Sequence, residues 1–552
     1  MRRRGSLRLI TLGALAAASV AVPVGFSGAK VISSANENAH TVIISLPGPF
    51  DGCTFLNAAP GSSSDAILDL VRPSAFQTTP AGGLAGEGGA ISSAELTSLQ
   101  PETVRYTLAA NLHWSNGATL SGIDLVTWWQ RAKHMASVLS DGYRAIKSLT
   151  VSSDGLTVTA VFGTNYADWS LLFRDVEERG VSGGCGIAKL VRDPSLGPYE
   201  VRSATPSRVV LTMNHAWPGS PNRFGRVIIT TNPIPPTSAR AVFAGYSLDV
   251  SRSYVQSLSS YPTLSSRIGS SARVEELAFA PKGRSTRRIL VRKALSWSLN
   301  RQAMINTLWG SVTFLPSVAQ SALFSQAQNA YPGGGGTGPV GQTTTTTTPT
   351  AATNGLNDCF SCAVEALKSA GYVHRASRWF DASGAPLSVA LATGPSALDR
   401  AIGRLALDAW RHLGVVASVV VEPSEDAAAV AVAQNVVDAS IFARSTSTAP
   451  STTARSWSGP PYFDSFPSGV RMARVNVLFN QAVGIFNPVT ADVTWLTMDR
   501  VLLNAYWVRP LFTAPTVQSW TGTLSNVVGS FLTTGFVDEV LNWSITPLTP
   551  QN

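Results

Sequence analysis

Hydrophobic and polar positions alternate every second residue in some segments of the chain and follow a helical period in others, which predicts a mixed α/β fold. Residues 41–46 (TVIISL) form an apolar run that ends at the turn Pro47-Gly48-Pro49, as expected of a buried strand. Alternating segments around short polar turns predict two hairpins further along. Their strands are expected at residues 149–152 with 156–162, and at residues 199–203 with 208–213.

The pattern becomes helical beyond Ser285. One predicted helix face there consists of Val291, Ala294, Leu295, Ser298 and Leu299. A later helix face consists of Leu398, Ile402, Leu405, Ala409 and Leu413, with Gly414 as the stop signal. Strands are predicted on either side of this later helix, at residues 387–393 and 415–421, and the strand–helix–strand order implies a parallel pair with a right-handed crossover.

Residues 328–353 carry no hydrophobic pattern and are predicted to be a disordered linker. They contain four consecutive glycines from Gly333 and six consecutive threonines from Thr343, and such a composition cannot build a core. The spacing of Gly336, Gly338 and Gly341 matches G-x-G-x-x-G. A dinucleotide site would need a strand before this motif and a helix after it, and neither is predicted, so the match is attributed to composition.

The amino terminus has the pattern of an export signal. Four arginines at positions 2, 3, 4 and 8 precede an apolar run over residues 9–24, and small residues Ser27 and Ala29 follow. We expect cleavage after Ala29, with an uncleaved anchor as the alternative, and an extracytoplasmic location in either case. No cysteine precedes Cys53, so no lipid anchor is expected.

Length and charge narrow the function further. A chain of 552 residues exceeds the size at which single cores stop growing, so at least two lobes are expected. The formal charge is +9, but without the four arginines of the signal 38 basic residues face 33 acidic ones. The basic residues are not clustered as a nucleic-acid binder requires, and no nucleic-acid partner is expected.

The cysteines indicate an oxidising compartment. Cys53, Cys185, Cys359 and Cys362 allow three pairings, of which we favour Cys53 with Cys185 and Cys359 with Cys362, because the last two are near neighbours in sequence. The alternative for Cys359 and Cys362 is a C-x-x-C redox or metal pair. Such a site needs the motif at the start of a helix beside a strand–helix–strand unit, whereas here the motif follows the predicted linker.

Motifs of catalysis are missing. The sequence has no H-E-x-x-H and no P-loop, and S-x-x-K occurs only at Ser27 to Lys30 in the signal region. The six histidines are scattered and lack metal-ligand spacing. The chain is therefore not expected to be an enzyme, and no metal or cofactor is predicted.

Four landmarks occur in order along the chain. They are a strand, turn and helix with Trp114, Asn116, Gly117 and Asp124; the turn Gly197-Pro198-Tyr199 into a strand pair that ends at residues 214–217 (NHAW); the segment VRKALSWSLNRQAMI from Val291; and the pair CAVEALKSAGY and IGRLALDAWRHLGVVASVVV. In this order they resemble the ABC-transporter extracellular solute-binding proteins of the dipeptide, oligopeptide and nickel-binding family, family 5. The resemblance covers nearly the whole mature chain.

The resemblance implies a periplasmic-binding-protein-like clamshell of class II (cluster C), with two lobes and an extra middle domain. The implied boundaries are residues 1–29 for the signal; 40–60, 191–270 and 495–552 for lobe I; 61–190 for the middle domain; and 271–494 for lobe II, with the linker inside it. It also implies a monomer that captures a peptide or peptide-like small molecule by lobe closure and delivers it to the transmembrane subunits of an ABC permease.

The sequence departs from the family pattern where a peptide's amino end would bind. Peptide-binding members have an aspartate there that pairs with the α-ammonium, but no acidic residue occurs between Asp438 and Asp464. Smaller departures are Ala280, where an asparagine is usual, and Asn300, where an aspartate is usual. The missing acid leaves a second hypothesis open, a degenerate envelope scaffold or signal-peptide binder. A secreted hydrolase is the third.

Seven residues are candidates for the ligand cleft, because the family lines its cleft at these positions. They are Phe50, Asp51, Phe442, Arg444, Trp457, Tyr462 and Phe463. For each aromatic residue the alternative is ordinary core packing. Arg444 is a possible two-pronged donor to a ligand carboxylate or phosphate, with a plain surface arginine as the alternative.

Overall fold

The computed structural model describes 18 stretches of the chain. They are residues 41–53, 63–79, 84–86, 89–135, 137, 139–217, 224–232, 242–247, 250–261, 263–310, 316–324, 326, 328, 330–332, 358–445, 449–458, 472–527 and 537–545. The predicted export signal lies outside these residues, and so does most of the predicted linker. The described part is mixed α/β, as the alternation of sequence periods predicts.

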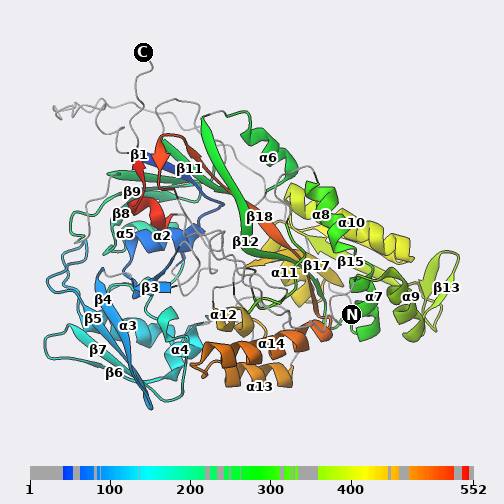
Figure 1. The fold of residues 1–552 in the computed structure, drawn as a ribbon, viewed down its shortest axis with the longest axis horizontal. Coiled ribbons are helices and arrows are strands. Elements are labelled where there is room, and N and C mark those ends of the chain that lie inside the picture. Colours follow the sequence, from blue (N-terminus) through cyan, green and yellow to red (C-terminus); the bar gives the residue numbers. More distant parts are fainter. Residues whose placement is uncertain are drawn as a thin grey trace, which may run out of the picture. The chain divides into compact units, whose positions relative to one another are not determined.

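A ten-stranded mixed sheet organises the fold (Figure 1). Two long antiparallel strands, β12 (Leu264–Phe279) and β18 (Val508–Thr521), lie side by side within it and carry shorter strands on either side. The strand order is β16-β15-β17-β12-β18-β11-β1-β10-β9-β8. The shorter strands are β1 (Thr41–Ser45), β8 (Tyr199–Thr205), β9 (Arg208–Met213), β10 (Arg226–Thr230), β11 (Val242–Ser247), β15 (Ser388–Thr393), β16 (Val416–Val421) and β17 (Ala439–Ser445).

The amino-terminal part of the sheet encloses one core. Strand β1 pairs in parallel with β10 and β11, and the predicted hairpin at residues 199–213 is confirmed as β8 and β9. Helices α2 (Ser63–Val71) and α5 (Ile187–Arg192) pack against β8. The apolar side chains of this core include Val42, Ile44, Ile67, Leu70, Leu211 and Trp543.

A separate antiparallel sheet follows in the chain, with the order β4-β5-β7-β6. Its strands are β4 (Ile91–Leu99), β5 (Glu102–Leu108), β6 (Ile146–Val151) and β7 (Thr157–Phe162), and the second predicted hairpin is confirmed as β6 and β7. Helix α3 (Gly122–Ala132) begins after its N-cap Ser121, whose N–H donates to Asp124 Oδ2 at 2.9 Å. Helix α4 (Ser140–Ala145) precedes β6, and Trp114, Trp128 and Tyr143 lie in the core of this sheet.

The helical half of the chain surrounds β15, β16 and β17. Its helices are α7 (Ile289–Trp297), α8 (Arg301–Trp309), α9 (Phe360–Ser369), α10 (Ala397–Leu413) and α11 (Glu425–Ala433). Strands β15 and β16 are parallel, as the strand–helix–strand order predicts. Helix α10 ends at Gly414, whose φ of 92° favours glycine. The predicted face of α10 is partly wrong, because Ala406, Leu407 and Trp410 are buried whereas Leu405 and Ala409 are only partly buried.

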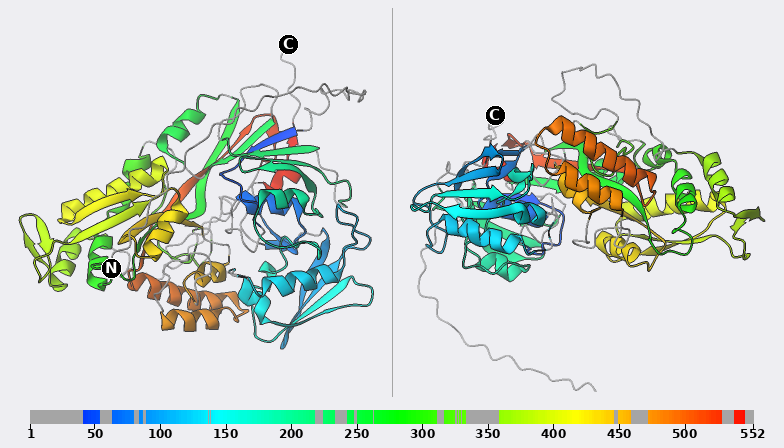
Figure 2. Two further views of the ribbon diagram at one scale, coloured as in Figure 1. Left: turned by 180° about the vertical axis from the view of Figure 1, so that it is seen from behind. Right: turned by 90° about the horizontal axis from the view of Figure 1, so that it is seen from below.

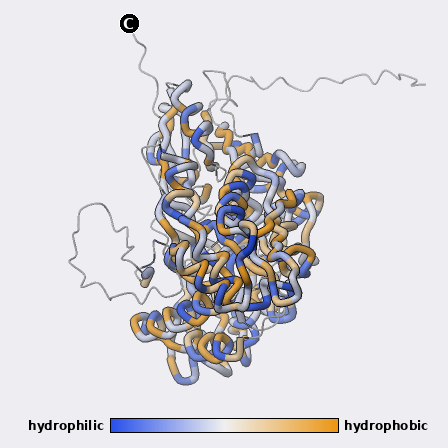
Figure 3. The backbone as a smooth tube through the Cα atoms, turned by 90° about the vertical axis from the view of Figure 1, so that its right-hand side faces the viewer, coloured by the Kyte–Doolittle hydropathy of each residue, from blue (hydrophilic) through white to orange (hydrophobic). Residues whose placement is uncertain are grey.

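Three further helices follow β17: α12 (Pro450–Arg455), α13 (Ala473–Ala482) and α14 (Pro488–Asn504). Helices α13 and α14 lie side by side (Figure 2). Hydrophobic and hydrophilic positions alternate along the backbone tube, as expected of elements with one buried face (Figure 3).

The remaining elements are β2 (Phe76–Thr78), β3 (Leu84–Gly86), η1 (Trp169–Leu171), α6 (Arg252–Leu258), β13 (Val373–Arg375), β14 (Arg378–Phe380), β19 (Leu524–Ser525), η2 (Asp538–Leu541) and β20 (Ser544–Ile545).

The structure pairs Cys53 with Cys185 and Cys359 with Cys362. The second pair lies at the start of a helix and not in the linker that precedes it, because α9 begins at Phe360. Cys359 is the N-cap of this helix, and its Sγ accepts the Cys362 N–H at 3.1 Å. None of the helices in the described part of the chain is long and apolar enough to span a bilayer.

Candidate functional site

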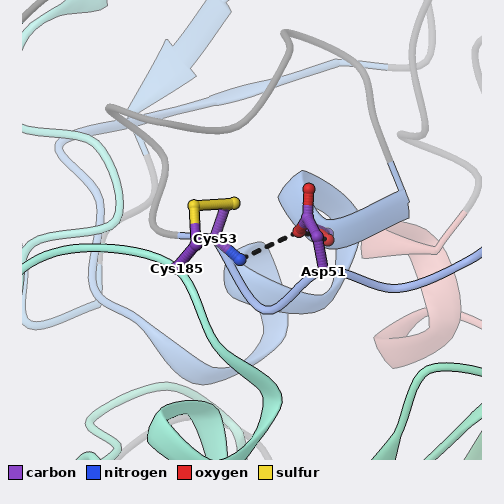
Figure 4. The surroundings of a disulfide bond; sticks show 4 residues. Asp51, Cys53 and Cys185 are labelled. Carbon is purple, nitrogen blue, oxygen red and sulfur yellow. Dashed lines mark hydrogen bonds between the residues drawn. A yellow bond between two sulfur atoms is a disulfide. The ribbon is translucent and has the colours of Figure 1, made fainter. Parts of the chain in front are cut away.

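The first two predicted cleft residues, Phe50 and Asp51, follow β1. The Phe50 side chain is 2% exposed and belongs to the core beneath α2. Asp51 Oδ1 accepts hydrogen bonds from the Cys53 N–H at 2.9 Å and from the Ser64 hydroxyl at 2.5 Å, beside the first disulfide (Figure 4). Both residues therefore have a visible structural role, and their contact with a ligand stays a prediction.

The other described candidates gather where β17 approaches α12. Phe442 is 7% exposed and packs in the core formed with α13 and α14. Arg444, two residues further along β17, has its guanidinium carbon 3.9 Å from the centre of the Trp457 ring, and its Nη1 donates to Ser456 Oγ at 3.3 Å. Tyr462 and Phe463 lie outside the described residues.

Arg444 has a buried partner that the sequence analysis missed. Its Nη2 lies 2.5 Å from Oε2 of Glu276, on the neighbouring strand β12, and the Glu276 side chain is 1% exposed. Burial raises the pKa of Glu276, and the positive charge of Arg444 partly offsets this effect. Arg444 is therefore neither a surface arginine nor a free anion binder. To bind a ligand carboxylate, its guanidinium would have to contact Glu276 and the ligand at the same time. We call Glu276, Arg444, Ser456 and Trp457 the Arg444 cluster.

Sequence did contain a signal for Glu276. It lies in the strand segment VEELAF, where Glu275 and Glu276 are adjacent and therefore point to opposite faces. Two acidic residues on opposite faces of a strand with apolar neighbours cannot both face solvent if both faces are covered, so at least one needs a buried basic partner. The identity of that partner depends on the pairing of β12 with β17, and these two strands are far apart in sequence.

A second buried acid lies near the cluster. Asp499 of α14 is 2% exposed and accepts the Ala322 N–H at 2.8 Å. Burial raises the pKa of Asp499 to about 7, and the negative charge of Glu276 adds to this rise. Glu276 in the Arg444 cluster and Asp499 nearby are thus two carboxyl groups whose charged forms are disfavoured by burial.

Helix α12 also reaches helix α4, which precedes β6. Arg455 Nε lies 2.7 Å from Asp141 Oδ2 on α4, although the two residues are 314 positions apart. The Ala167 N–H donates to the Val483 carbonyl at 2.7 Å close by, and α12 and α4 are neighbours in the ribbon (Figure 1). We call the ion pair between Asp141 and Arg455 the α4–α12 bridge. Because Arg455 directly precedes Ser456 and Trp457, the bridge is continuous with the Arg444 cluster.

The chemistry of this region suits binding. Among the described residues no group of three or more His, Cys, Asp or Glu side chains is arranged to hold a metal ion. The cluster combines an aromatic face, a guanidinium and a hydroxyl, which are groups that orient a small molecule in a cleft.

Comparisons with known proteins agree with this architecture. The sequence profile of the bacterial extracellular solute-binding proteins, family 5 Middle, matches residues 90–463. The chain is 26% identical over 184 residues to the oligopeptide-binding protein OppA of Mycobacterium tuberculosis (strain H37Rv), a match that covers 29% of this chain. The chain spans only 30% of the length of OppA in this match.

Solved structures show the fold over most of the chain. A periplasmic EDTA-binding protein, EppA, superposes with a TM-score of 0.77 at 18% identity, covering 92% of this chain and 97% of EppA. NikZ of Campylobacter jejuni, solved in complex with Ni(L-His), superposes with a TM-score of 0.73 at 15% identity, covering 92% of this chain and 99% of NikZ. These likenesses show that the fold is the two-lobed clamshell of periplasmic binding proteins.

Proposed function

The chain belongs to the bacterial extracellular solute-binding proteins of family 5, and we propose that it captures a peptide or peptide-like small molecule by closure of its two lobes. Membership of this family makes the chain a binding protein of the ABC-importer type that works outside the cytoplasm, and not an enzyme. In our proposal the closed form presents its ligand to the transmembrane subunits of an ABC permease, and the monomer is the working unit.

The α4–α12 bridge is the observation that carries the closure proposal. Asp141 belongs to the segment of the four-stranded sheet, and Arg455 belongs to the segment that follows β17. Two bodies joined by few strands close by hinge motion, and contacts of this kind are made or lost as they move. A ligand that binds between them stabilises the closed form by the difference in its affinity for the two forms.

The Arg444 cluster favours a ligand whose binding does not depend on an ammonium group paired with a carboxylate of the protein. No acidic residue lies between Asp438 and Asp464, and Glu276 already faces Arg444. The Trp457 ring is 7% exposed and holds the Arg444 guanidinium over one face, so it positions this guanidinium. EppA binds EDTA and the NikZ structure holds Ni(L-His), so metal chelates stand beside peptides as candidate ligands.

A thermal-shift screen tests the binding function. We expect one class among tripeptides, Ni(L-His) and metal–EDTA complexes to raise the Tm of the mature chain by several degrees. A ligand present at 100 times its Kd stabilises the folded state by about 3 kcal/mol. The same ligand should raise the Tm of a Trp457→Ala variant less. An unchanged Tm with every class of ligand would contradict the receptor function. It would favour the envelope scaffold, a hypothesis that the absence of an acidic residue between Asp438 and Asp464 also supports.

Removal of the α4–α12 bridge tests closure. We expect Arg455→Met to increase the average radius of gyration in small-angle X-ray scattering with ligand at subsaturating concentration. A partly buried ion pair is worth roughly 1 kcal/mol, which changes the ratio of closed to open forms about fivefold. Arg144→Met is the matched control, because Arg144 pairs with the same Asp141 carboxylate from within α4. An equal radius for Arg455→Met and wild type would show that the bridge does not contribute to closure.

A further inference from the structure

The disulfide between Cys359 and Cys362 closes a C-x-x-C motif at the start of helix α9. Helix α9 packs against α10, which connects the parallel strands β15 and β16. A redox-active C-x-x-C pair needs a helix start beside a strand–helix–strand unit, and the structure supplies both. A metal site would need further ligands, and the described residues arrange no group of three for one.

Contacts that do not involve the disulfide hold the start of α9 in place. The Cys359 N–H donates to the Trp297 carbonyl of α7 at 2.9 Å. The preceding residue, Asp358, accepts the Arg301 N–H at 3.0 Å and Arg301 Nε at 2.9 Å, and Arg509 of β18 donates to the same carboxylate. Two guanidinium groups thus face one carboxylate, and the neighbourhood of Cys359 carries surplus positive charge. The motif is expected to keep its place when the disulfide opens.

The Cys359 sulfur lies among groups that stabilise a negative charge. Its Sγ accepts the Cys362 N–H at 3.1 Å, and the Ser361 hydroxyl lies 3.5 Å from it. As the N-cap of the ten-residue helix α9, Cys359 also stands at the positive end of the helix dipole. Cysteine thiolates at helix N-termini and near arginines are stabilised relative to the thiol. A thiolate is therefore the favoured form of Cys359 once the disulfide is reduced.

The two sulfur atoms are expected to react differently. Thiol–disulfide exchange is faster when the sulfur that leaves is a stabilised thiolate. An incoming thiolate that attacks Cys362 Sγ releases Cys359 Sγ, which keeps the donors at the helix start. Both cysteines are half-buried, and Phe360 and Ser361 between them are exposed, so the pair is open to a small thiol from solvent.

We propose that the disulfide between Cys359 and Cys362 is a redox-active site that takes two electrons from a dithiol. One thiolate of the dithiol attacks Cys362 Sγ, which forms a mixed disulfide and releases Cys359 as a thiolate. The second sulfur of the dithiol then attacks the first, so the dithiol is oxidised to a disulfide and Cys362 leaves. Of the two protons that the dithiol gives up, one goes to Cys362 and one to water. This exchange is separate from ligand capture and does not depend on the proposed function.

Graded reduction of the full mature chain tests the proposal, with the disulfide between Cys53 and Cys185 as the internal control. The chain is equilibrated with mixtures of reduced and oxidised dithiothreitol, alkylated, and analysed by mass spectrometry for free thiols at each pair. We expect Cys359 and Cys362 to open at a ratio of reduced to oxidised dithiothreitol on the order of 100-fold lower, because they close a loop of 3 rather than 132 residues. The Asp51 carboxylate beside Cys53 also disfavours a thiolate there. Opening of both pairs at the same ratio would overturn the proposal.

Alkylation of single cysteines separates thiolate stabilisation from loop length. At pH 6, Cys359 in a Cys362→Ser variant is expected to react with iodoacetamide about tenfold faster than Cys362 in the matched Cys359→Ser variant, since only the thiolate reacts.

The Ser361 hydroxyl is a positioning group in this proposal. Adding Ser361→Ala to Cys362→Ser is expected to slow the reaction of Cys359 about threefold, and Ser361→Thr is expected to restore it. Equal rates for the two cysteines at pH 6 would overturn the proposal. If a single-cysteine variant does not fold, the graded reduction of the unaltered chain still decides.

Discussion

Replacement of Arg444 by methionine is expected to lower the free energy of unfolding by about 3–5 kcal/mol at pH 7, the usual cost of removing one partner of a buried ion pair. Methionine preserves the apolar stem of the side chain but removes the guanidinium, which lies over the Trp457 ring and donates to Ser456 and Glu276. Glu276 remains 1% exposed and has no cation to compensate its charge. Urea denaturation followed by tryptophan fluorescence measures the loss.

The pH dependence of stability in the Arg444→Met variant tests whether the unpaired Glu276 causes the loss. Its pKa in the folded protein is already raised by burial, and removing Arg444 takes away the interaction that lowers it. A carboxyl group with a folded-state pKa above its unfolded value binds more protons in the folded state. Stability of the variant is therefore highest below the unfolded pKa and falls as the pH rises through the folded pKa. We expect the difference between variant and wild type to be smaller at pH 5 than at pH 7.

Arg411→Met is the matched control for this prediction. Arg411 lies on α10 with its side chain 57% exposed, near Asp408, which is 72% exposed. Substitutions at exposed positions of this kind change stability by about 0.5 kcal/mol or less. If Arg444→Met cost no more than Arg411→Met, or if its cost were independent of pH, Glu276 would not be a buried anion that depends on Arg444.

The sequence predicted those parts of the fold that depend on local patterns. Hairpins β6–β7 and β8–β9 and the end of α10 at Gly414 each follow from residues that are close in sequence. The face of α10 was predicted less well. Trp410 was left out of the predicted face, yet its Nε1 donates to the Leu295 carbonyl at 3.0 Å in the core. Which side chains of α10 are buried depends on tertiary packing, and the helical period of the sequence carries no information about it.

In the candidate site, too, residues were predicted from local sequence, whereas their partners from distant segments were missed. Arg444 and Trp457 were predicted from their position in the variable segment, and the structure brings them into contact. Glu276 and Asp141 were missed because their partners lie 168 and 314 residues away. Only the pairing of β12 with β17, and the approach of α12 to α4, bring these charges together. Phe50 and Phe442 have the core packing that was the alternative for every aromatic candidate, and their role toward a ligand stays a prediction.

Loss of the disulfide between Cys53 and Cys185 is expected to lower the free energy of unfolding by about 2–5 kcal/mol. The two cysteines are 132 residues apart, and the segment between them contains the whole four-stranded sheet. A bridge across such a long segment restricts the unfolded chain strongly, so its removal increases the entropy of the unfolded state. Denaturation of a Cys53→Ala, Cys185→Ala double variant measures this loss without a reductant, which would open both disulfides.

The second disulfide provides the comparison that separates this entropic effect from local packing. Cys359 and Cys362 are three residues apart, and the same loop-closure relation gives only about 2 kcal/mol for a loop of this length. The double variant Cys359→Ala, Cys362→Ala is therefore expected to lose less stability, although it also loses the N-cap acceptor of α9. If the two double variants lost equal stability, loop length would not explain the effect, and packing around Cys53, which is 8% exposed, would have to account for it.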